Sequence, residues 1–172
     1  MSNLREAFSS THHANLGWQE HEAAIDRVAA AGRAERIGVC LWKARYMLEA
    51  WAYQESNNLL LKRFISRYKA EDAGVAQKIV SQALQEFLLS FCSTCLGAKE
   101  LIDDDLKIIC EDCGGSGVKR YTDRERARSM QMSLQRYRSV SHKLAWVQRL
   151  INEEESRVNY VLNVELERFS IA

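Results

Sequence analysis

The chain of 172 residues contains two pairs of cysteines with the spacing of a metal site. Cys92 and Cys95 form the first Cys-x-x-Cys pair, Cys110 and Cys113 form the second, and fourteen residues separate the pairs. A thiolate pair of this spacing can bind one tetrahedral ion from a tight turn, and four thiolates complete a structural zinc site. The spacing therefore predicts one Zn²⁺ ion per chain, held by all four side chains.

A glycine follows each pair two residues on, at Gly97 and at Gly115. A sharp turn with positive φ is expected there, because glycine has no Cβ to clash. Two disulfides or a reactive dithiol are alternative uses of the cysteines, and spacing alone does not distinguish zinc from iron. With cysteine at all four ligand positions, no coordination position is open. We therefore expect the metal to stabilise a fold and not to activate water.

Composition excludes several classes of protein. The formal net charge is +1, proline is absent and strong helix formers are frequent, which indicates a mostly helical fold. No Ser/His/acid set, phosphate-binding loop or open metal site is recognisable, so we predict no enzymatic activity and no small-molecule substrate. The N-terminus lacks the layout of a signal peptide, and no apolar run approaches the ~20 residues of a membrane helix. A reducing cytoplasm is therefore the expected location, with no membrane partner.

Positive charge is concentrated directly behind the cysteines. Between Lys119 and Arg149 there are nine basic and two acidic residues, a local net charge of +7. Such a segment attracts phosphate backbones, so we predict that it binds double-stranded DNA; a solvated helix face is the alternative. The predicted phosphate contacts are Lys119, Arg120, Arg124, Arg128, Arg136 and Arg138, and the predicted base contacts are His142 and Lys143.

The hydrophobic pattern predicts the helices that position these groups. Apolar residues three and four apart predict helices at about 18–31, 34–54, 59–68 and 74–91, with a break at Ser56, Asn57 and Asn58. The apolar stripe of the second helix includes Cys40 and Trp51, so Cys40 is expected to be a core residue and not a fifth ligand. Alternating apolar residues around three aspartates predict a small hairpin between the cysteine pairs.

Two helices are expected after the cysteines. Thr122 and Glu125 match a capping box, which predicts a helix through about Met132. Ser141 is a suitable N-cap for the last helix, and the two helices together are compatible with a helix-turn-helix. In that arrangement His142 and Lys143, at the start of the second helix, face the major groove.

The predicted fold is thus mostly α: a helical bundle with an inserted small zinc-ribbon hairpin and a C-terminal helix-turn-helix-like pair. Four parts are expected along the chain. They are a flexible tail (1–17), a helical domain (18–91), a four-cysteine zinc knuckle (92–118) and a basic helical DNA-binding segment (119–172).

Four features of the chain between about Asn58 and Arg168 occur together in a known family. They are Cys92-Ser-Thr-Cys95-Leu-Gly97, Cys110-Glu-Asp-Cys113-Gly-Gly115-Ser-Gly117, a segment of the type Tyr121…Arg126-Ala-Arg128, and a last helix with Trp146, Val147, Leu150 and Glu154-Glu155-Ser156. In these features the chain resembles the late-gene antitermination proteins of lambdoid phages, the Q proteins of the phage lambda type. Glycine-bearing Cys-x-x-Cys motifs also occur in chaperones of the DnaJ type, and their position between a buried helix and a basic C-terminal segment is the more specific feature.

The resemblance implies a zinc-containing, DNA-binding factor of a phage or prophage. Such a factor loads onto paused bacterial RNA polymerase near a late promoter and makes the polymerase resistant to terminators. RNA polymerase is expected as a partner on this ground alone. Two other functions stay open from the residues themselves. One is a zinc-dependent DNA-binding transcription regulator without antitermination. The other is a DnaJ-like zinc module that holds unfolded peptides on exposed apolar surface near the metal.

Overall fold

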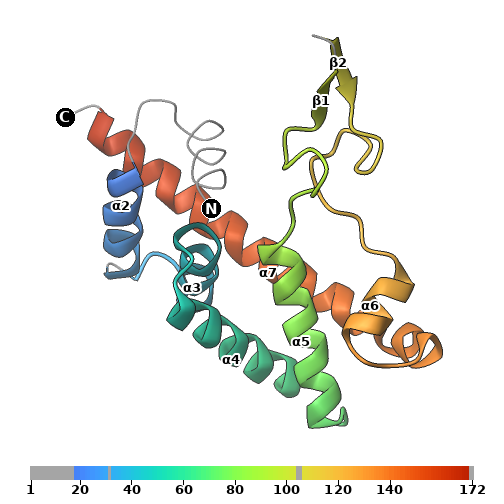
Figure 1. The fold of residues 1–172 in the computed structure, drawn as a ribbon. Coiled ribbons are helices and arrows are strands. Elements are labelled where there is room, and N and C mark those ends of the chain that lie inside the picture. Colours follow the sequence, from blue (N-terminus) through green and yellow to red (C-terminus); the bar gives the residue numbers. More distant parts are fainter. Residues whose placement is uncertain (1–17, 31, 104–105, 171–172) are drawn as a thin grey trace.

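The computed structural model describes residues 18–30, 32–103 and 106–170 (Figure 1). The described part is mostly helical with one small antiparallel sheet, as predicted, and the expected tail 1–17 lies outside the described residues. The elements in chain order are α2 (Trp18–Ala30), α3 (Arg36–Trp42), the π-helix η1 (Lys43–Met47), α4 (Ala50–Arg67), α5 (Ala73–Leu88), β1 (Glu100–Asp103), β2 (Leu106–Ile109), α6 (Asp123–Ser129) and α7 (Leu134–Ser170).

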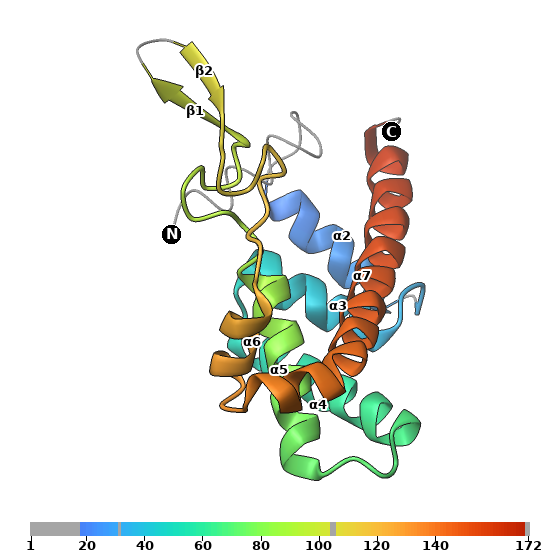
Figure 2. The ribbon, with the colours of Figure 1, turned by 90° about the vertical axis from the view of Figure 1, so that its right-hand side faces the viewer.

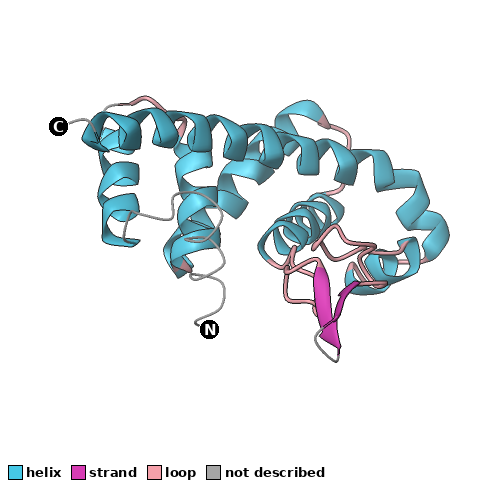
Figure 3. Ribbon diagram, turned by 90° about the horizontal axis from the view of Figure 1, so that it is seen from above, coloured by secondary structure: helices cyan, strands magenta, loops and turns pink. Residues whose placement is uncertain are grey.

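Helix α7 is the element on which the other helices pack. It runs for 37 residues, and α2, α3, α5 and α6 contact it at successive positions (Figure 1, Figure 3). An α-helix rises 1.5 Å per residue, so α7 is about 55 Å long. Neither α7 nor any other helix in the described residues is long and apolar enough to cross a membrane.

Two clusters of buried apolar side chains form the core of the helical body, which comprises α2–α7 without the sheet. The larger cluster lies between α3, α4, α5, α6 and the first half of α7, and the second lies between α2, α3 and the C-terminal half of α7. The larger includes Leu41, Leu60, Phe64, Ile79, Leu84, Tyr137, Leu144 and Val147. The second includes Ile25, Val28, Trp42, Val158, Leu162 and Leu166. Cys40 is only 2% exposed, as predicted for a core residue.

The cysteine lobe (residues 92–118) projects from the end of α5, with the hairpin at its far end (Figure 2). The hairpin is the predicted one: β1 and β2 pair antiparallel, with Glu100 opposite Ile109. Two chain segments connect the lobe to the body. They are joined by a bridge between Phe91 and Val118 and by the Lys119 N–H, which donates to the Ser90 carbonyl at 2.7 Å. The lobe therefore stands on a short two-stranded neck.

The predicted break at Ser56, Asn57 and Asn58 is wrong. All three residues lie inside α4, where Ser56 is fully buried. The chain breaks instead at Leu48, which has a left-handed φ of 58° directly after the π-helix η1. Packing of α4 against α3 and α5 outweighs the weak helix preference of serine and asparagine. With the break moved, Trp51 is 54% exposed and does not lie on the expected buried stripe.

The last helix also begins earlier than predicted. Helix α7 starts at Leu134, where the Ser133 Oγ accepts a hydrogen bond from the Arg136 N–H at 3.1 Å. Ser141, the predicted N-cap, lies inside the helix, and its hydroxyl donates to the Arg138 carbonyl at 3.0 Å. Serine is compatible with both positions, so the sequence alone did not select the true cap.

The capping box before α6 is confirmed. The Thr122 hydroxyl accepts from the Glu125 N–H at 3.2 Å, and the Glu125 carboxylate accepts from the Thr122 N–H at 2.7 Å. Helix α6 has only seven residues and ends at Ser129, before the expected Met132. The helix-turn-helix-like detail is not confirmed, because the predicted second helix starts before residue 141.

Candidate metal centre and basic surface

The four cysteines predicted as metal ligands converge in the lobe, where their Sγ atoms all lie within 4.8 Å of one another. Cys92 Sγ is 3.8 Å from Cys110 Sγ, and Cys95 Sγ is 3.7 Å from Cys113 Sγ. Tetrahedral zinc with Zn–S bonds of about 2.3 Å requires sulfurs about 3.8 Å apart. A disulfide requires about 2.05 Å, and all four cysteines are free. The cluster therefore has the dimensions of a tetrahedral thiolate site and not of a disulfide pair.

Glycines allow the chain to turn tightly around this cluster. Gly97 and Gly115 have φ of 89° and 76°, which confirms the positive φ predicted for both. A Cβ on Gly97 would lie 2.7 Å from the Phe91 ring, and a Cβ on Gly117 would lie 2.7 Å from the Gly97 carbonyl oxygen. Larger residues at these positions would separate the two cysteine turns.

Backbone hydrogen bonds hold the two turns side by side. The Cys92 N–H donates to the Gly117 carbonyl at 2.9 Å, and the Cys110 N–H donates to the Lys99 carbonyl at 3.0 Å. Each cysteine turn thus donates a hydrogen bond to a residue beside the other turn. The positions of the two thiol pairs therefore depend on each other.

A further backbone group points directly at a sulfur. The Gly117 N–H lies 3.3 Å from Cys113 Sγ. Burial raises the pKa of the Cys113 thiol, but hydrogen bonds from Gly117 and from the thiols of Cys110 and Cys95 lower it, and the result is a pKa of about 6. A lowered pKa favours the thiolate, which is the form that binds a metal ion. In the same cluster a backbone hydrogen bond at Cys113 lowers the pKa of Cys110, but burial and hydrogen bonds with the neighbouring thiols outweigh it and raise that pKa to about 11. A lowered pKa is therefore not a property of the whole set. The convergence of four free thiols is what suits the cluster to a metal ion such as zinc.

The surface of the lobe is apolar and acidic. Half of the ten large apolar side chains that are exposed in the described residues lie on it, and all four residues of β2 are exposed. The lobe carries six acidic and two basic residues, a net charge of −4. Its exposed apolar residues are Leu96, Leu106, Ile108, Ile109 and Val118. The lobe surface is therefore unsuited to contact phosphates directly.

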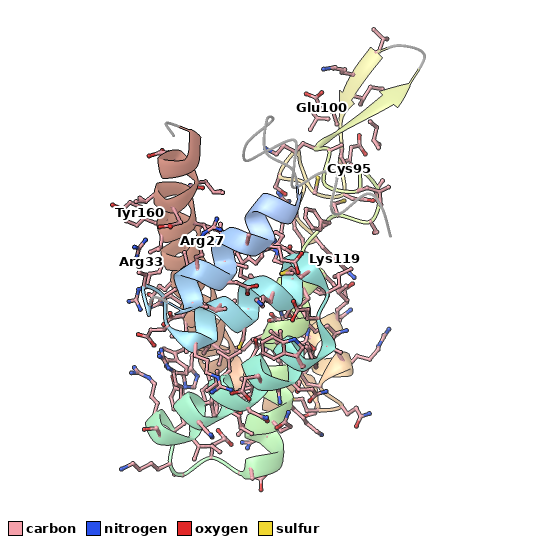
Figure 4. All side chains as sticks on the ribbon, turned by 90° about the vertical axis from the view of Figure 1, so that its left-hand side faces the viewer. Arg27, Arg33, Cys95, Glu100, Lys119 and Tyr160 are labelled. Atoms are coloured by element: carbon pink, nitrogen blue, oxygen red, sulfur yellow. The ribbon has the colours of Figure 1, made fainter. Side chains whose placement is uncertain are left out.

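Most of the predicted DNA contacts lie on an exposed surface beside the lobe. Lys119 and Arg120 are in the neck that returns from the lobe, Arg124 and Arg128 are on α6, and Arg138 is on the second turn of α7. All five are exposed, and in the described part of the chain none forms an ion pair. Figure 4 shows Lys119 at the boundary between lobe and body. These five form what we call the basic surface.

Arg136 and Lys143 lie differently from the other predicted contacts. Both are ion-paired with Glu71 in the turn between α4 and α5, Arg136 at 3.1 Å. Lys143 Nζ also lies 5.2 Å from the centroid of the Tyr68 ring. His142 is exposed on α7, but it is in the interior of that helix and not at its start. The prediction that a helix begins at these two residues and directs them toward the bases is therefore wrong, because α7 begins at Leu134.

Arg126, which contributes to the +7 charge, is largely internal. Its Nε and Nη2 each donate to the Glu86 carboxylate at 2.8 Å, and Gln148 Nε2 donates to the same carboxylate at 2.7 Å. Glu86 is 7% exposed, so this is a buried, hydrogen-bonded pair between α5, α6 and α7. No local pattern indicates this pair, because the partners are 40 residues apart in the chain.

Sequence reasoning also missed a cavity at the neck, lined by Arg45 of η1, Ser90, Tyr121 and Asn152 among others. The residues that line this cavity come from segments far apart in the chain. The one sequence signal for the cavity is that Gln148 and Asn152 are polar although they adjoin the apolar stripe of α7. No protein-family model matches the chain, and no curated protein matches it either. Function is therefore inferred from the thiol cluster, the basic surface and this cavity.

Proposed function

We propose that the protein is a zinc-containing, double-stranded-DNA-binding factor that acts in transcription antitermination and is not an enzyme. The observation that supports DNA binding best is the basic surface, whose five cations are exposed without carboxylate partners in the described residues. Phosphates are attracted to unpaired surface cations, and binding releases the counterions of DNA. His142 and Arg136 are secondary candidates on the adjoining turns of α7.

The metal has a structural role in this proposal. Cys92, Cys95, Cys110 and Cys113 hold one Zn²⁺ ion, which fixes the lobe and with it the neck that carries Lys119 and Arg120. Loss of the ion would leave these two cations on a loose segment. Ordering them again would then cost conformational entropy at the moment of DNA binding.

Antitermination and the partnership with bacterial RNA polymerase rest on the resemblance to the lambdoid phage proteins, not on a contact in the structure. A factor of that kind needs a DNA-binding surface and a separate surface for the polymerase. The lobe is such a second surface, since it combines a charge of −4 with five exposed apolar side chains. Exposed apolar patches of this kind mark protein interaction sites.

The same lobe surface favours one other candidate function. A DnaJ-like module that holds unfolded peptides requires exposed apolar side chains near the metal, and Leu96, Leu106 and Ile109 are 64–68% exposed. That function gives no reason for the basic surface, so we rank it second. A zinc-dependent regulator without antitermination has the same structural support as the antiterminator.

A salt titration of duplex binding tests the DNA-binding part. Replacing one phosphate contact, as in Arg124→Gln, should lower the magnitude of the log–log salt slope by about 0.9. Lys62→Gln, an exposed lysine of α4 outside the basic surface, is the matched control and should leave the slope unchanged. If the affinity for duplex DNA does not change with salt concentration, or if both variants change the salt slope equally, the basic surface is only a solvated face.

A two-template transcription assay separates antitermination from other regulation. One template carries a late-promoter region before a terminator, and the other carries an unrelated promoter before the same terminator. The antiterminator must increase read-through on the first template only, and the increase must disappear in Cys92→Ser. Changed initiation with unchanged read-through would identify an ordinary DNA-binding regulator. The DnaJ-like module makes a different prediction. In that case the native chain should not bind DNA, and the Arg124→Gln variant should still bind unfolded peptides.

A further inference from the structure

A cavity of about 380 Å³ lies where the neck of the cysteine lobe meets the helical body. Its wall comes from five segments: η1, the end of α5, residues 118–121 of the neck, Arg126 of α6 and the middle of α7. The volume falls within the range of small-molecule pockets, about 300–1,000 Å³. We propose that this cavity binds one nucleotide unit, with its phosphate toward Arg45 and Lys119 and its sugar or base toward Gln148 and Asn152.

The wall offers net positive charge for a phosphate. The lining contains three cations, Arg45, Lys119 and Arg126, and one carboxylate, Glu86. Glu155 pairs with Arg45 from outside the lining, so the net charge of the three cations and their two carboxylates is +1. Glu86 is already satisfied by two hydrogen bonds from Arg126 and by one from Gln148, so its charge is compensated inside the protein. Lys119 has no carboxylate within ion-pair distance in the described residues and is the cation most available to a ligand.

Arg45 is held rigidly in the wall. Its Nη1 donates to Glu155 at 2.6 Å, its Nη2 donates to Ser90 Oγ at 2.8 Å, and its guanidinium carbon lies 4.5 Å from the centroid of the Phe87 ring. An immobilised guanidinium loses little further entropy when an anion binds. Arg45 also belongs to the π-helix η1, and Leu48 after it has a strained left-handed φ of 58°. Short π-helices and strained residues are frequent at functional sites.

Two amides extend the site beyond a phosphate. Gln148 and Asn152 are four residues apart on α7, so they lie on the same face of the helix, one turn from each other. An amide both donates and accepts, as the edge of a nucleic-acid base or a sugar hydroxyl requires. Ile151 and Phe87 add apolar wall to the same cavity. A small anion would leave this half of the cavity unused.

The position of the cavity gives the ligand a consequence for the whole molecule. Ser90 and Lys119 line the cavity, and each belongs to one of the two segments of the neck. A ligand that joins Lys119 to Asn152 therefore fixes the lobe relative to α7. Lys119 belongs both to this cavity and to the basic surface, whereas Arg45, Gln148 and Asn152 belong to the cavity alone. A change at Asn152 therefore tests the cavity separately from DNA binding by α6.

Calorimetric titration of the zinc-loaded full chain tests the proposal. The probes are thymidine 5′-monophosphate (dTMP), adenosine 5′-monophosphate and inorganic phosphate. We expect both nucleotides to bind at least about tenfold more tightly than phosphate, because the sugar and base can add hydrogen bonds to the neutral amides of Gln148 and Asn152 that inorganic phosphate lacks. Lys119→Gln should weaken all three probes by about tenfold, whereas Asn152→Ala should weaken the nucleotides and leave phosphate unchanged. Both residues are exposed, so both variants should fold.

The controls separate this site from the basic surface. Arg149→Gln removes an exposed arginine that follows Gln148 directly but does not line this cavity, and it should change dTMP binding less than about twofold. Arg124→Gln should weaken duplex DNA without affecting dTMP. A four-nucleotide oligo(dT) distinguishes the sources of the ligand. Tighter binding than dTMP points to a nucleotide of a single strand, and weaker binding points to a free nucleotide.

Three results would overturn the proposal. The first is no binding of either nucleotide at millimolar concentration. The second is nucleotide binding that neither Lys119→Gln nor Asn152→Ala weakens. The third is inorganic phosphate that binds as tightly as the nucleotides, which would define a small-anion site only.

Discussion

The cysteine lobe and the helical body are held together by different means. The body buries two apolar clusters, in which side chains such as Phe64, Leu84 and Trp42 are completely covered. The buried cluster of the lobe consists of the four cysteines, with Leu101 partly buried against them, and β2 is exposed along its whole length. Burial of one large apolar side chain stabilises a fold by roughly 1.5–3 kcal/mol, and among the lobe side chains that the structure describes none is a fully buried large apolar group.

The difference shows what the thiol cluster is for. A hairpin of two four-residue strands is at best marginally stable in water. Metal binding contributes about 10–16 kcal/mol to the folding of zinc-finger peptides, which is ample for a lobe of this size. The body should therefore fold without metal and the lobe should not. Three experiments test this contrast, beginning with the largest expected effect.

Removal of the metal should unfold the lobe alone. Elemental analysis should find one zinc per chain, and Cys110→Ser should lose the ion and the cooperative part of melting that belongs to the lobe. Amide exchange should become fast at Leu106 and Ile108, while far-ultraviolet dichroism should keep the signal of the helices. Cys40→Ser, which replaces a cysteine outside the cluster, is the control and should retain one zinc. Slow amide exchange in the hairpin of the metal-free chain would show that the lobe folds without metal, as the body does.

Truncation in the core should have the opposite pattern. Phe64 is fully buried in the larger cluster, so Phe64→Ala should reduce the free energy of unfolding of the body by about 3–5 kcal/mol. The neighbouring Ile65 is 47% exposed, and Ile65→Ala should cost less than about 1 kcal/mol. Urea titrations give both values. The zinc content of both variants should stay at one per chain, and loss of metal from Phe64→Ala would show that lobe and body are not independent.

Charge pairs in the body should matter least. A hydrogen bond from Lys143, together with the charges of Lys143 and Arg136, holds the pKa of Glu71 below its usual value, against the effect of burial. The resulting stabilisation is complete above the pKa of an unfolded glutamate, about 4.5, and is lost as the pH falls through the lower folded-state pKa. Glu71→Gln should cost about 1 kcal/mol or less at pH 7 and should flatten this part of the pH profile.

The control for that measurement is Glu153→Gln, an exposed carboxylate of α7 that forms no ion pair in the described residues. Urea midpoints between pH 7 and pH 3 should change with pH in this variant as they do in the native chain. If Glu71→Gln retains the full acid sensitivity of the native chain, the pair with Lys143 and Arg136 contributes nothing to stability.

Short-range patterns were predicted well from the sequence. The thiol cluster, the capping box at Thr122 and the hairpin each depend on residues only a few positions apart or on a repeated spacing, and all three are confirmed. The positive φ of Gly97 and Gly115 belongs to the same class, since a Cys-x-x-Cys turn demands it locally. Local chemistry is sufficient for such features because the groups that decide them are neighbours in the chain.

Helix boundaries and buried polar pairs were not predicted, because distant residues decide them. Ser56 belongs to a helix only because it is packed, while Leu48 breaks the chain although leucine is a strong helix former. Arg126 looks like any surface arginine until Glu86, 40 residues earlier, is placed beside it. Whether a charge is free to meet DNA is therefore a tertiary property. The sequence shows that residues 119–149 carry a net charge of +7, but it does not show which of these charges lie on the surface and which are buried.

The length and position of α7 have a consequence for synthesis. The ion pair between Arg33 and Glu165 joins residues 132 positions apart, and α2 packs on the C-terminal half of α7. At 5–20 residues per second, a ribosome needs roughly 7–26 s to travel between those two codons. Throughout that interval Ile25, Val28 and Trp42 lack the side chains of α7, Val158, Leu162 and Leu166, that complete their cluster. The nascent chain is therefore exposed to aggregation until its last helix emerges. The yield of mature protein should increase when chaperones are abundant and should fall when translation is slowed, because slow translation lengthens the exposed interval.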